Sequence, residues 1–192
     1  ASTVSGTLAV TANGAITGSG NLAITGTTTL AAGAANNIVL NSAGNNFTGA
    51  VIIASGNNVT LVDASGIDLG ASTVSGNLSV SASGAITDSG NLAVTGTTTL
   101  AAGSANNVAL NSAGNNFTGA VIITSANDAT LVDTSGIVLG ASTVSGGYTV
   151  TATTGDITNT GALAVSGASI FTASNGSSIS VNNIGNAFSG TV

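Results

Sequence analysis

Apolar and polar residues alternate with a period of two along most of the chain. In Thr7–Ala12, Leu8 and Val10 share one face of the segment, and the residues between them are small or polar. Such alternation, interrupted by Gly, Asn, Ser and Asp, indicates short strands separated by turns. Helical spacing is not sustained anywhere, so the pattern predicts an all-β fold. The residues predicted to face inward in the first part of the chain are Leu8, Val10, Leu22, Ile24, Ile38, Leu40, Val51, Ile53, Val59, Leu61, Ile67 and Leu69.

This pattern recurs with a period of 70 residues. The hexapeptide ASTVSG begins at Ala1, Ala71 and Ala141, and residues 1–70 differ from residues 71–140 at 15 positions, which leaves 55 identical. The third copy is truncated and carries one extra residue within Thr151–Thr158. We therefore interpret residues 1–192 as one continuous solenoid with units 1–70, 71–140 and a truncated 141–192. We expect the chain to be a length of a longer rod.

The differences between the first two copies agree with the predicted faces. An inward position changes conservatively, from Ile24 to Val94, whereas a position predicted to face solvent changes from Asp68 to Val138. The inward position of Val59 is an exception, because the second copy holds a smaller alanine there. Large changes of residue type between the first two copies therefore fall mostly at positions that the pattern predicts to be exposed to solvent.

Short strands, tight turns and a long tandem period are typical of a parallel β-helix. Coils of roughly 20–25 residues give about three coils in each repeat, and coils stack about 4.8 Å apart. One repeat then rises by about 14 Å and the whole chain by about 40 Å. A β-sandwich of short strands is the rival fold, but its strands occupy non-equivalent positions and do not require such similar tandem copies.

The stretch NSAGNNFTGAV occurs unchanged at Asn41–Val51 and Asn111–Val121, and a diverged copy, NNIGNAFSGTV, ends the chain. We interpret it as a corner at which asparagine and glycine turn the chain and a phenylalanine fills the core. We expect Asp63 and Asp133 to accept backbone hydrogen bonds in Asx-type turns, and a functional role for these carboxylates is the alternative. The predicted corner residues are Phe47, Phe117, Phe188, Asn46, Asn116, Gly49, Gly119, Asp63 and Asp133.

Composition excludes several classes of function. The chain has no Lys, Arg or His, and six aspartates are its only charged side chains. Without cationic side chains it cannot neutralise phosphates, so we expect no nucleic-acid binding. The absence of Cys and His argues against disulfides and the usual zinc and copper sites. No apolar run is long enough for a spanning helix, and five aromatic residues are too few for the aromatic girdles of a membrane barrel, so we expect no membrane insertion.

The aspartates do not form a recognisable catalytic or metal-binding set. Asp63 and Asp133 hold equivalent positions, roughly 14 Å apart in the coil scheme, which is too far for paired-carboxylate catalysis. We expect no enzymatic activity, no cofactor and no metal, although weak calcium binding at exposed aspartates stays open. Thr27 and Thr29 are predicted to face outward together, as in ice-binding β-helices, which makes ice binding a remote alternative. The Asn-X-Ser/Thr sequences match the glycosylation pattern, and we attribute them to composition.

The segment ASTVSGNLSVSASGAITDSGNLAVTGTTTLAAGSANNVALNSAGNNFTGAV, at Ala71–Val121, resembles the repeats of filamentous-haemagglutinin-type exoproteins. These are surface proteins of two-partner secretion and related autotransporter adhesins. The resemblance implies a right-handed parallel β-helix, export from a Gram-negative cell, and an extracellular or cell-surface location. It also implies a fibrous role in adhesion or surface structure. The chain contains no RGD tripeptide, so integrin-type adhesion has no support in this sequence.

These observations predict a structural, rod-forming segment of a large secreted bacterial surface protein that acts as a fibre or an adhesin stalk. The alternative is a segment that assembles into an extracellular filament or sheath. Its expected partners are neighbouring repeats or copies of itself, packed along the axis or side by side. Contact with a host or neighbouring cell would be made by regions outside these residues. Outward-facing Ile52 and Ile122 slightly favour lateral packing.

Overall fold

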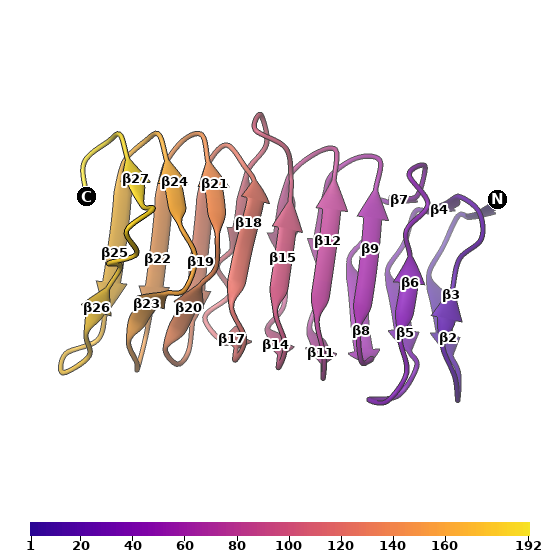
Figure 1. Cartoon of the computed structure of the whole chain (residues 1–192). Coiled ribbons are helices and arrows are strands. Elements are labelled where there is room, and N and C mark those ends of the chain that lie inside the picture. The colour runs from indigo at the N-terminus through magenta and orange to yellow at the C-terminus, as the bar shows by residue number, and fades with distance from the viewer.

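A computed structural model describes all 192 residues as a β-solenoid of 27 strands without a helix (Figure 1). Every strand pairs in parallel with strands of the neighbouring coils. The coils stack into nine turns, which span about 40 Å at the usual strand spacing. The expectation of an all-β parallel solenoid is therefore confirmed.

Two sheets of nine strands each run the whole length of the solenoid. The first large sheet contains β2 (Leu8–Thr11), β5 (Thr28–Ala31), β8 (Val51–Ser55), β10 (Ile67–Leu69), β13 (Ile86–Asp88), β16 (Val108–Leu110), β19 (Ala129–Asp133), β22 (Tyr148–Ala152) and β25 (Ser169–Ala173). The second large sheet contains β3 (Ile16–Thr17), β6 (Ile38–Leu40), β9 (Val59–Asp63), β12 (Leu78–Ala82), β15 (Thr98–Ala101), β18 (Val121–Ser125), β20 (Ile137–Leu139), β23 (Ile157–Asn159) and β26 (Ile179–Ser180).

Three small sheets of three strands close the edges between the large sheets. The N-terminal small sheet contains β1 (Ser2–Val4), β4 (Leu22–Ile24) and β7 (Asn46–Phe47). The middle small sheet contains β11 (Ser72–Val74), β14 (Leu92–Val94) and β17 (Asn116–Phe117). The C-terminal small sheet contains β21 (Ser142–Val144), β24 (Leu163–Val165) and β27 (Ala187–Phe188). In Figure 1 the first and last of these lie along the top of the rod, and the middle one lies along the bottom.

Each 70-residue repeat makes three and a half turns, in agreement with the about three coils of roughly 20–25 residues expected from the sequence. A complete repeat supplies ten strands, three in a small sheet and seven in the large sheets. One turn crosses each large sheet once, so seven crossings amount to three and a half turns. Equivalent strands of successive copies therefore alternate between the large sheets, with β2 in the first, β12 in the second and β22 in the first again.

The small sheets change edge for the same reason. In the first and third copies a small-sheet strand follows the second large sheet and leads into the first, as β4 does between β3 and β5. In the second copy the order is reversed, as β14 follows β13 of the first large sheet and leads into β15 of the second. Consecutive copies are thus related by a half-turn about the solenoid axis combined with a translation along it.

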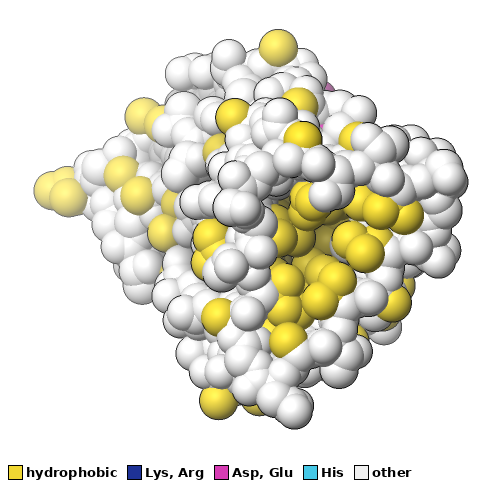
Figure 2. Space-filling view, turned by 90° about the vertical axis from the view of Figure 1, so that its right-hand side faces the viewer, with side chains coloured by type: hydrophobic (Ala, Val, Ile, Leu, Met, Phe, Trp, Pro, Cys, Tyr) yellow, Lys and Arg dark blue, Asp and Glu magenta, His cyan; other side chains and the backbone are white.

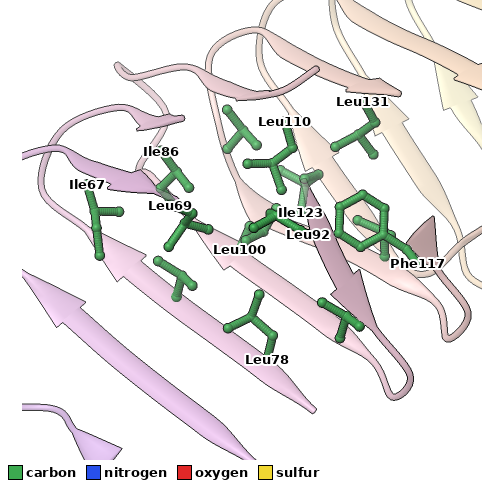
Figure 3. Packing of buried hydrophobic residues seen from close by; sticks show 14 of the residues in the cluster. Ile67, Leu69, Leu78, Ile86, Leu92, Leu100, Leu110, Phe117, Ile123 and Leu131 are labelled. Atoms are coloured by element: carbon green, nitrogen blue, oxygen red, sulfur yellow. The ribbon is translucent and has the colours of Figure 1, made fainter. Parts of the chain in front are cut away.

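The core is a continuous apolar cluster of 38 buried residues between the sheets (Figure 3). All twelve positions predicted to face inward belong to this cluster or pack against it, so the predicted faces are confirmed. Leu8, Val10 and Leu22 lie in the first coils and are only partly buried, because no other coil of residues 1–192 lies over them. Parallel strands that bury one face and stack side chains in register explain why the alternating pattern was so regular.

The strand register accounts for the small alanine that replaces Val59 in the second copy. Val59 pairs with Leu78 in the next coil, whereas the equivalent Ala129 pairs with Tyr148. All four side chains are buried, so the volume lost at position 129 is recovered by the larger ring at position 148. Conservation of total core volume across a coil boundary therefore permits this substitution.

Candidate functional site

The repeated Asn41–Val51 stretch contains the last strand of a small sheet, and a carboxylate closes that sheet. The stretch is not entirely a corner, because Asn46 and Phe47 form β7. The Phe47 amide has no fourth strand beyond it and instead donates to Asp63 Oδ2 over 2.7 Å. Asp63 Oδ1 accepts from the Ser65 amide over 2.7 Å and from the Ser65 hydroxyl over 2.8 Å. Asp63 thus occupies the place of the missing strand.

The second copy reproduces this arrangement on the opposite edge of the solenoid. Asp133 Oδ2 accepts from the Phe117 amide over 2.7 Å, and its Oδ1 accepts from the amide and hydroxyl of Ser135. Phe47, Phe117, Asp63 and Asp133 are all at most 1% exposed. A buried carboxylate with several donors is stabilised by charge-assisted hydrogen bonds, so each aspartate is anchored in the interior.

A second buried polar residue, which the sequence pattern did not single out, lies beside each phenylalanine. Asn45 Oδ1 accepts from the Leu22 amide over 2.9 Å, and its Nδ2 donates to the Leu40 carbonyl over 3.0 Å. Asn115 accepts from the Leu92 amide and donates to Asp88 Oδ2 over 2.6 Å. The period-two alternation contained the signal for this residue, because Asn45 lies two positions before the inward-facing Phe47.

The predicted asparagines lie on the outside of the same strands. Asn46 and Asn116 are exposed, and each accepts only a long hydrogen bond, of 3.3 and 3.5 Å respectively, from the serine hydroxyl of the next coil. Phe188, in the third copy, is partly exposed and packs edge to face against Phe171 at a centroid distance of 6.2 Å. The buried form of the arrangement is thus complete in two copies.

Gly49 and Gly119 allow close approach between coils rather than an unusual backbone conformation. Positive φ angles occur only at Gly33, Gly103 and Gly176. A Cβ atom added to Gly49 would lie 2.5 Å from the Gly26 carbonyl carbon, so any side chain at this position would collide with the backbone of the preceding coil. The glycine is therefore required by the stacking distance between coils.

The aspartates are distributed rather than gathered. Asp63 lies on β9 of the second large sheet and Asp133 on β19 of the first, so equivalent carboxylates lie on different sheets instead of along one line. Asp88 accepts from the amides of Asn111 and Ser112. No three His, Cys, Asp or Glu side chains come together. Both oxygens of Asp63 and of Asp133 already accept from donors of the chain, an arrangement suited to joining coils.

The outward isoleucines cover a junction within the chain. A Cβ atom added to Gly70 would lie 2.5 Å from Ile52 Cγ1, so the side chain of Ile52 rests over the point where β10 gives way to β11. Ile122 is related in the same way to Gly140. Ile52 and Ile122 therefore contribute to packing within the chain. They lie at the junctions between copies, where the small sheet changes from one edge of the solenoid to the other. The structure contains no helix of sufficient length and apolarity to cross a membrane.

A comparison with protein families matches nearly the whole chain to one model, described as repeats of unknown function (DUF5649). The matched segments are residues 1–54, 56–124 and 126–192. The chain belongs to this family of repeats. The second and third DUF5649 segments begin 70 residues apart, since 126 − 56 = 70, which is the period of the sequence itself. No curated protein and no solved structure matched the chain.

Proposed function

We propose that this chain is a rod-forming structural segment of a large secreted bacterial surface protein, which acts as a fibre or adhesin stalk without catalytic activity. The observation that carries the proposal is the continuity of the two large sheets, each of which runs unbroken through nine strands. Hydrogen bonds between coils run along the axis and join every coil to the next, which favours a stiff rod. Secretion and a Gram-negative cell surface are inferred from the resemblance of Ala71–Val121 to filamentous-haemagglutinin-type repeats.

Repeats whose buried aspartates, Asp63 and Asp133, accept internal hydrogen bonds at both oxygens are suited to spacing other domains apart. The buried carboxylates join one coil to the next, and the outward faces of the large sheets are made mainly of small uncharged residues. The absence of Lys and Arg also leaves trypsin no cleavage site, which suits extracellular exposure.

Ice binding through the threonine rows is disfavoured by the half-turn between copies. Thr29 lies on β5 of the first large sheet, and its equivalent Thr99 lies on β15 of the second. A flat ice-binding surface needs its threonines on one face, and these two face opposite sides of the solenoid.

The surface role can be tested on intact source cells with antibodies raised against this chain. Immunogold electron microscopy should place the label along fibres that extend from the cell surface. Trypsin treatment should leave the epitope uncut, either on the cells or in the released material, because residues 1–192 contain no Lys or Arg, whereas proteinase K should destroy it. Labelling confined to the cell interior, or protection from proteinase K, would contradict the proposal.

A further inference from the structure

The loop between β25 and β26 contains a turn that the equivalent loops of the first two copies lack. Those two loops begin their turn at Gly33 and Gly103, which both have positive φ angles. In the third copy Ser174 takes that place, and the positive φ angle, 87°, moves to Gly176. The Ser177 amide donates to the Ser174 carbonyl over 3.0 Å. A turn with a positive φ angle at its third residue and a negative one at its second is of type II.

Asn175 occupies the second position of this turn, directly before Gly176. Both residues are exposed, and nothing lies within 4 Å of a Cβ atom added to Gly176. The Gly176 amide makes no backbone hydrogen bond. The amide nitrogen that follows the asparagine side chain is therefore open and unpaired by the backbone.

This exposure belongs to the loop and does not depend on the position of the last coil. In both earlier copies the equivalent loop has a coil on either side of it. The residues equivalent to Asn175 and Gly176 are nevertheless exposed in each case, and they are Ala34, Ala35, Ser104 and Ala105. The side chain at the position of Asn175 thus faces solvent even within a longer solenoid.

The third loop has also lost a hydrogen bond that ties the earlier loops together. In the first copy the Asn36 side chain donates to the Ala32 carbonyl over 2.8 Å, and in the second copy Asn106 donates to Ala102 over 2.9 Å. The third copy has Ser177 at this position, and its hydroxyl lies 3.0 Å from that of the first serine of the turn. Fewer ties between the ends of a loop leave its backbone freer to move.

One other asparagine precedes a glycine, but its surroundings are set by the position of the first coil. Nothing lies within 4 Å of a Cβ atom added to Gly14, which follows Asn13. The equivalent Gly84 would meet the Gly66 amide nitrogen at 2.7 Å. Figure 2 shows this end of the solenoid, where apolar side chains are uncovered because no coil of residues 1–192 lies over them. The open space at Gly14 is therefore not a property of its bend.

We propose that Asn175 is a site of spontaneous deamidation, in which the Gly176 amide nitrogen attacks Cγ of the Asn175 side chain. A bond forms between this nitrogen and Cγ, the Cγ–Nδ2 bond breaks, and the amide proton leaves with the side-chain nitrogen as ammonia. A succinimide ring remains, and water opens it at either carbonyl carbon to give aspartate or isoaspartate. Glycine favours ring closure because it has no Cβ atom to shield its nitrogen or restrict its backbone.

The reaction consumes one water, releases one ammonia and adds one carboxylate to the chain. The net charge of the chain changes from −6 to −7, since −6 − 1 = −7. The modified turn lies outside both large sheets, so the coils should stay stacked when isoaspartate lengthens its main chain by one atom. The inference depends on this loop alone and not on the rod-forming function proposed above.

The test follows the purified 192-residue chain during incubation at neutral and mildly alkaline pH. Chymotrypsin cleaves after Phe171 and Phe188, which releases a peptide that carries both Asn175 and the exposed Asn182. Mass spectrometry locates each deamidated residue, and electron-transfer fragmentation distinguishes aspartate from isoaspartate. Asn182 is the internal control, because an asparagine follows it instead of a glycine. Circular dichroism verifies that the chain stays folded.

Asn175 should yield both products, and it should react at least about tenfold faster than Asn182, because only its neighbour lacks a Cβ atom. Its rate in the folded chain should lie within about tenfold of the rate in guanidinium chloride, because an exposed loop opens at little cost in free energy. Alkaline pH should accelerate the reaction, since the attacking nitrogen must lose its proton.

Two variants separate the effect of the glycine from that of the loop. Gly176→Ala should slow the reaction by about tenfold or more, because it shields the attacking nitrogen. Ser177→Asn leaves both reacting residues in place and restores the side chain that ties the loop in the first two copies, so it should also slow the reaction. Asn175→Asp provides the reference for the charge of the product.

Other results would overturn the inference. Equal rates at Asn175 and Asn182 would do so, and so would a folded chain that stays unmodified while the chain in guanidinium chloride reacts. Aspartate without any isoaspartate would exclude the succinimide route. A reaction that Ser177→Asn leaves unchanged would show that the freedom of the loop plays no part.

Discussion

The first two copies of NSAGNNFTGAV and the diverged third copy differ most in the contacts of their phenylalanine. In Asn41–Val51 and Asn111–Val121 the phenylalanine is buried and its amide donates to an aspartate 16 residues further on. In the third copy Phe188 is partly exposed and packs against Phe171 instead. In the first two copies the partner of the phenylalanine amide lies outside the repeated stretch, at Asp63 and Asp133, so the unit of stability extends beyond the conserved stretch.

The largest effect should come from removing the buried phenylalanine. Phe47→Ala and Phe117→Ala should each lower the free energy of unfolding by about 4 kcal/mol, because each leaves a cavity in a packed core. Phe188→Ala is the matched control and should cost about half as much or less, since its ring is already partly exposed. Equilibrium denaturation followed by circular dichroism measures all three, and equal losses would show that the following coil contributes nothing.

Removal of the capping carboxylate should have the next largest effect. Asp63→Ala should cost about 3 kcal/mol, because the buried Phe47 amide loses its partner together with two further hydrogen bonds to Ser65. Asp68→Ala is the control, since Asp68 is a partly exposed outward residue that is valine in the second copy. Denaturant titration of both variants should separate them clearly, and a loss of less than 0.5 kcal/mol for Asp63→Ala, roughly that of a neutral surface change, would count against the cap.

A smaller effect is expected where coils approach closely. Gly49→Ala should cost about 2 kcal/mol, because its methyl group would press on the Gly26 backbone of the preceding coil. Gly6→Ala should be nearly neutral, because nothing lies within 4 Å of an added Cβ atom there. Thermal unfolding of the two variants would test whether stacking distance, rather than turn conformation, selects glycine after the phenylalanine.

The smallest effect concerns Tyr148, which replaces the leucine of the first two copies. Burial raises the pKa of its hydroxyl above the ordinary value of about 10. The hydroxyl has no hydrogen-bond partner, and the Ser142 hydroxyl already bonds to the Ile123 amide and the Gly140 carbonyl. Above pH of about 10 the unfolded chain loses this proton while the folded protein keeps it, so stability should fall as the pH rises further.

Tyr148→Phe provides the control for this pH dependence. It should abolish the loss of stability that Tyr148 causes above pH of about 10. It should also raise the free energy of unfolding by about 1 kcal/mol at neutral pH, because an unpaired buried hydroxyl is removed. Urea titrations at neutral and alkaline pH would measure both effects, and identical pH profiles for the two proteins would exclude Tyr148 as their source.

The fold was predictable to the extent that local pattern determines it. Alternation identified the inward side chains, and the tandem copies indicated a solenoid. The sequence predicted about three turns for each repeat but not the additional half-turn, because coil length varies. Ala23 pairs with Asn46, an offset of 46 − 23 = 23 residues, whereas Val51 pairs with Leu69, an offset of 69 − 51 = 18. A 70-residue period therefore does not reveal whether a copy begins on the same sheet as the last.

The site shows the same division between local and long-range information. The residue type and its turn-like surroundings indicated that Asp63 accepts backbone hydrogen bonds, and its bond to the Ser65 amide is local. The bond to the Phe47 amide depends on which residues of successive coils lie side by side, which the sequence of one coil does not specify. The pairing of Ala129 with Tyr148 could not be predicted from the sequence for the same reason.

The half-turn between copies has a consequence for the straightness of a long rod. The two edges of each copy differ, because a small sheet lies at only one of them. Repeats with unequal edges that all faced the same way would curve the rod toward one side, whereas repeats that alternate keep it straight. Because the half-turn moves the small sheet to the other edge at every copy, any curvature that this difference introduces in one repeat is opposed in the next. Any number of repeats can then be added without the rod closing on itself.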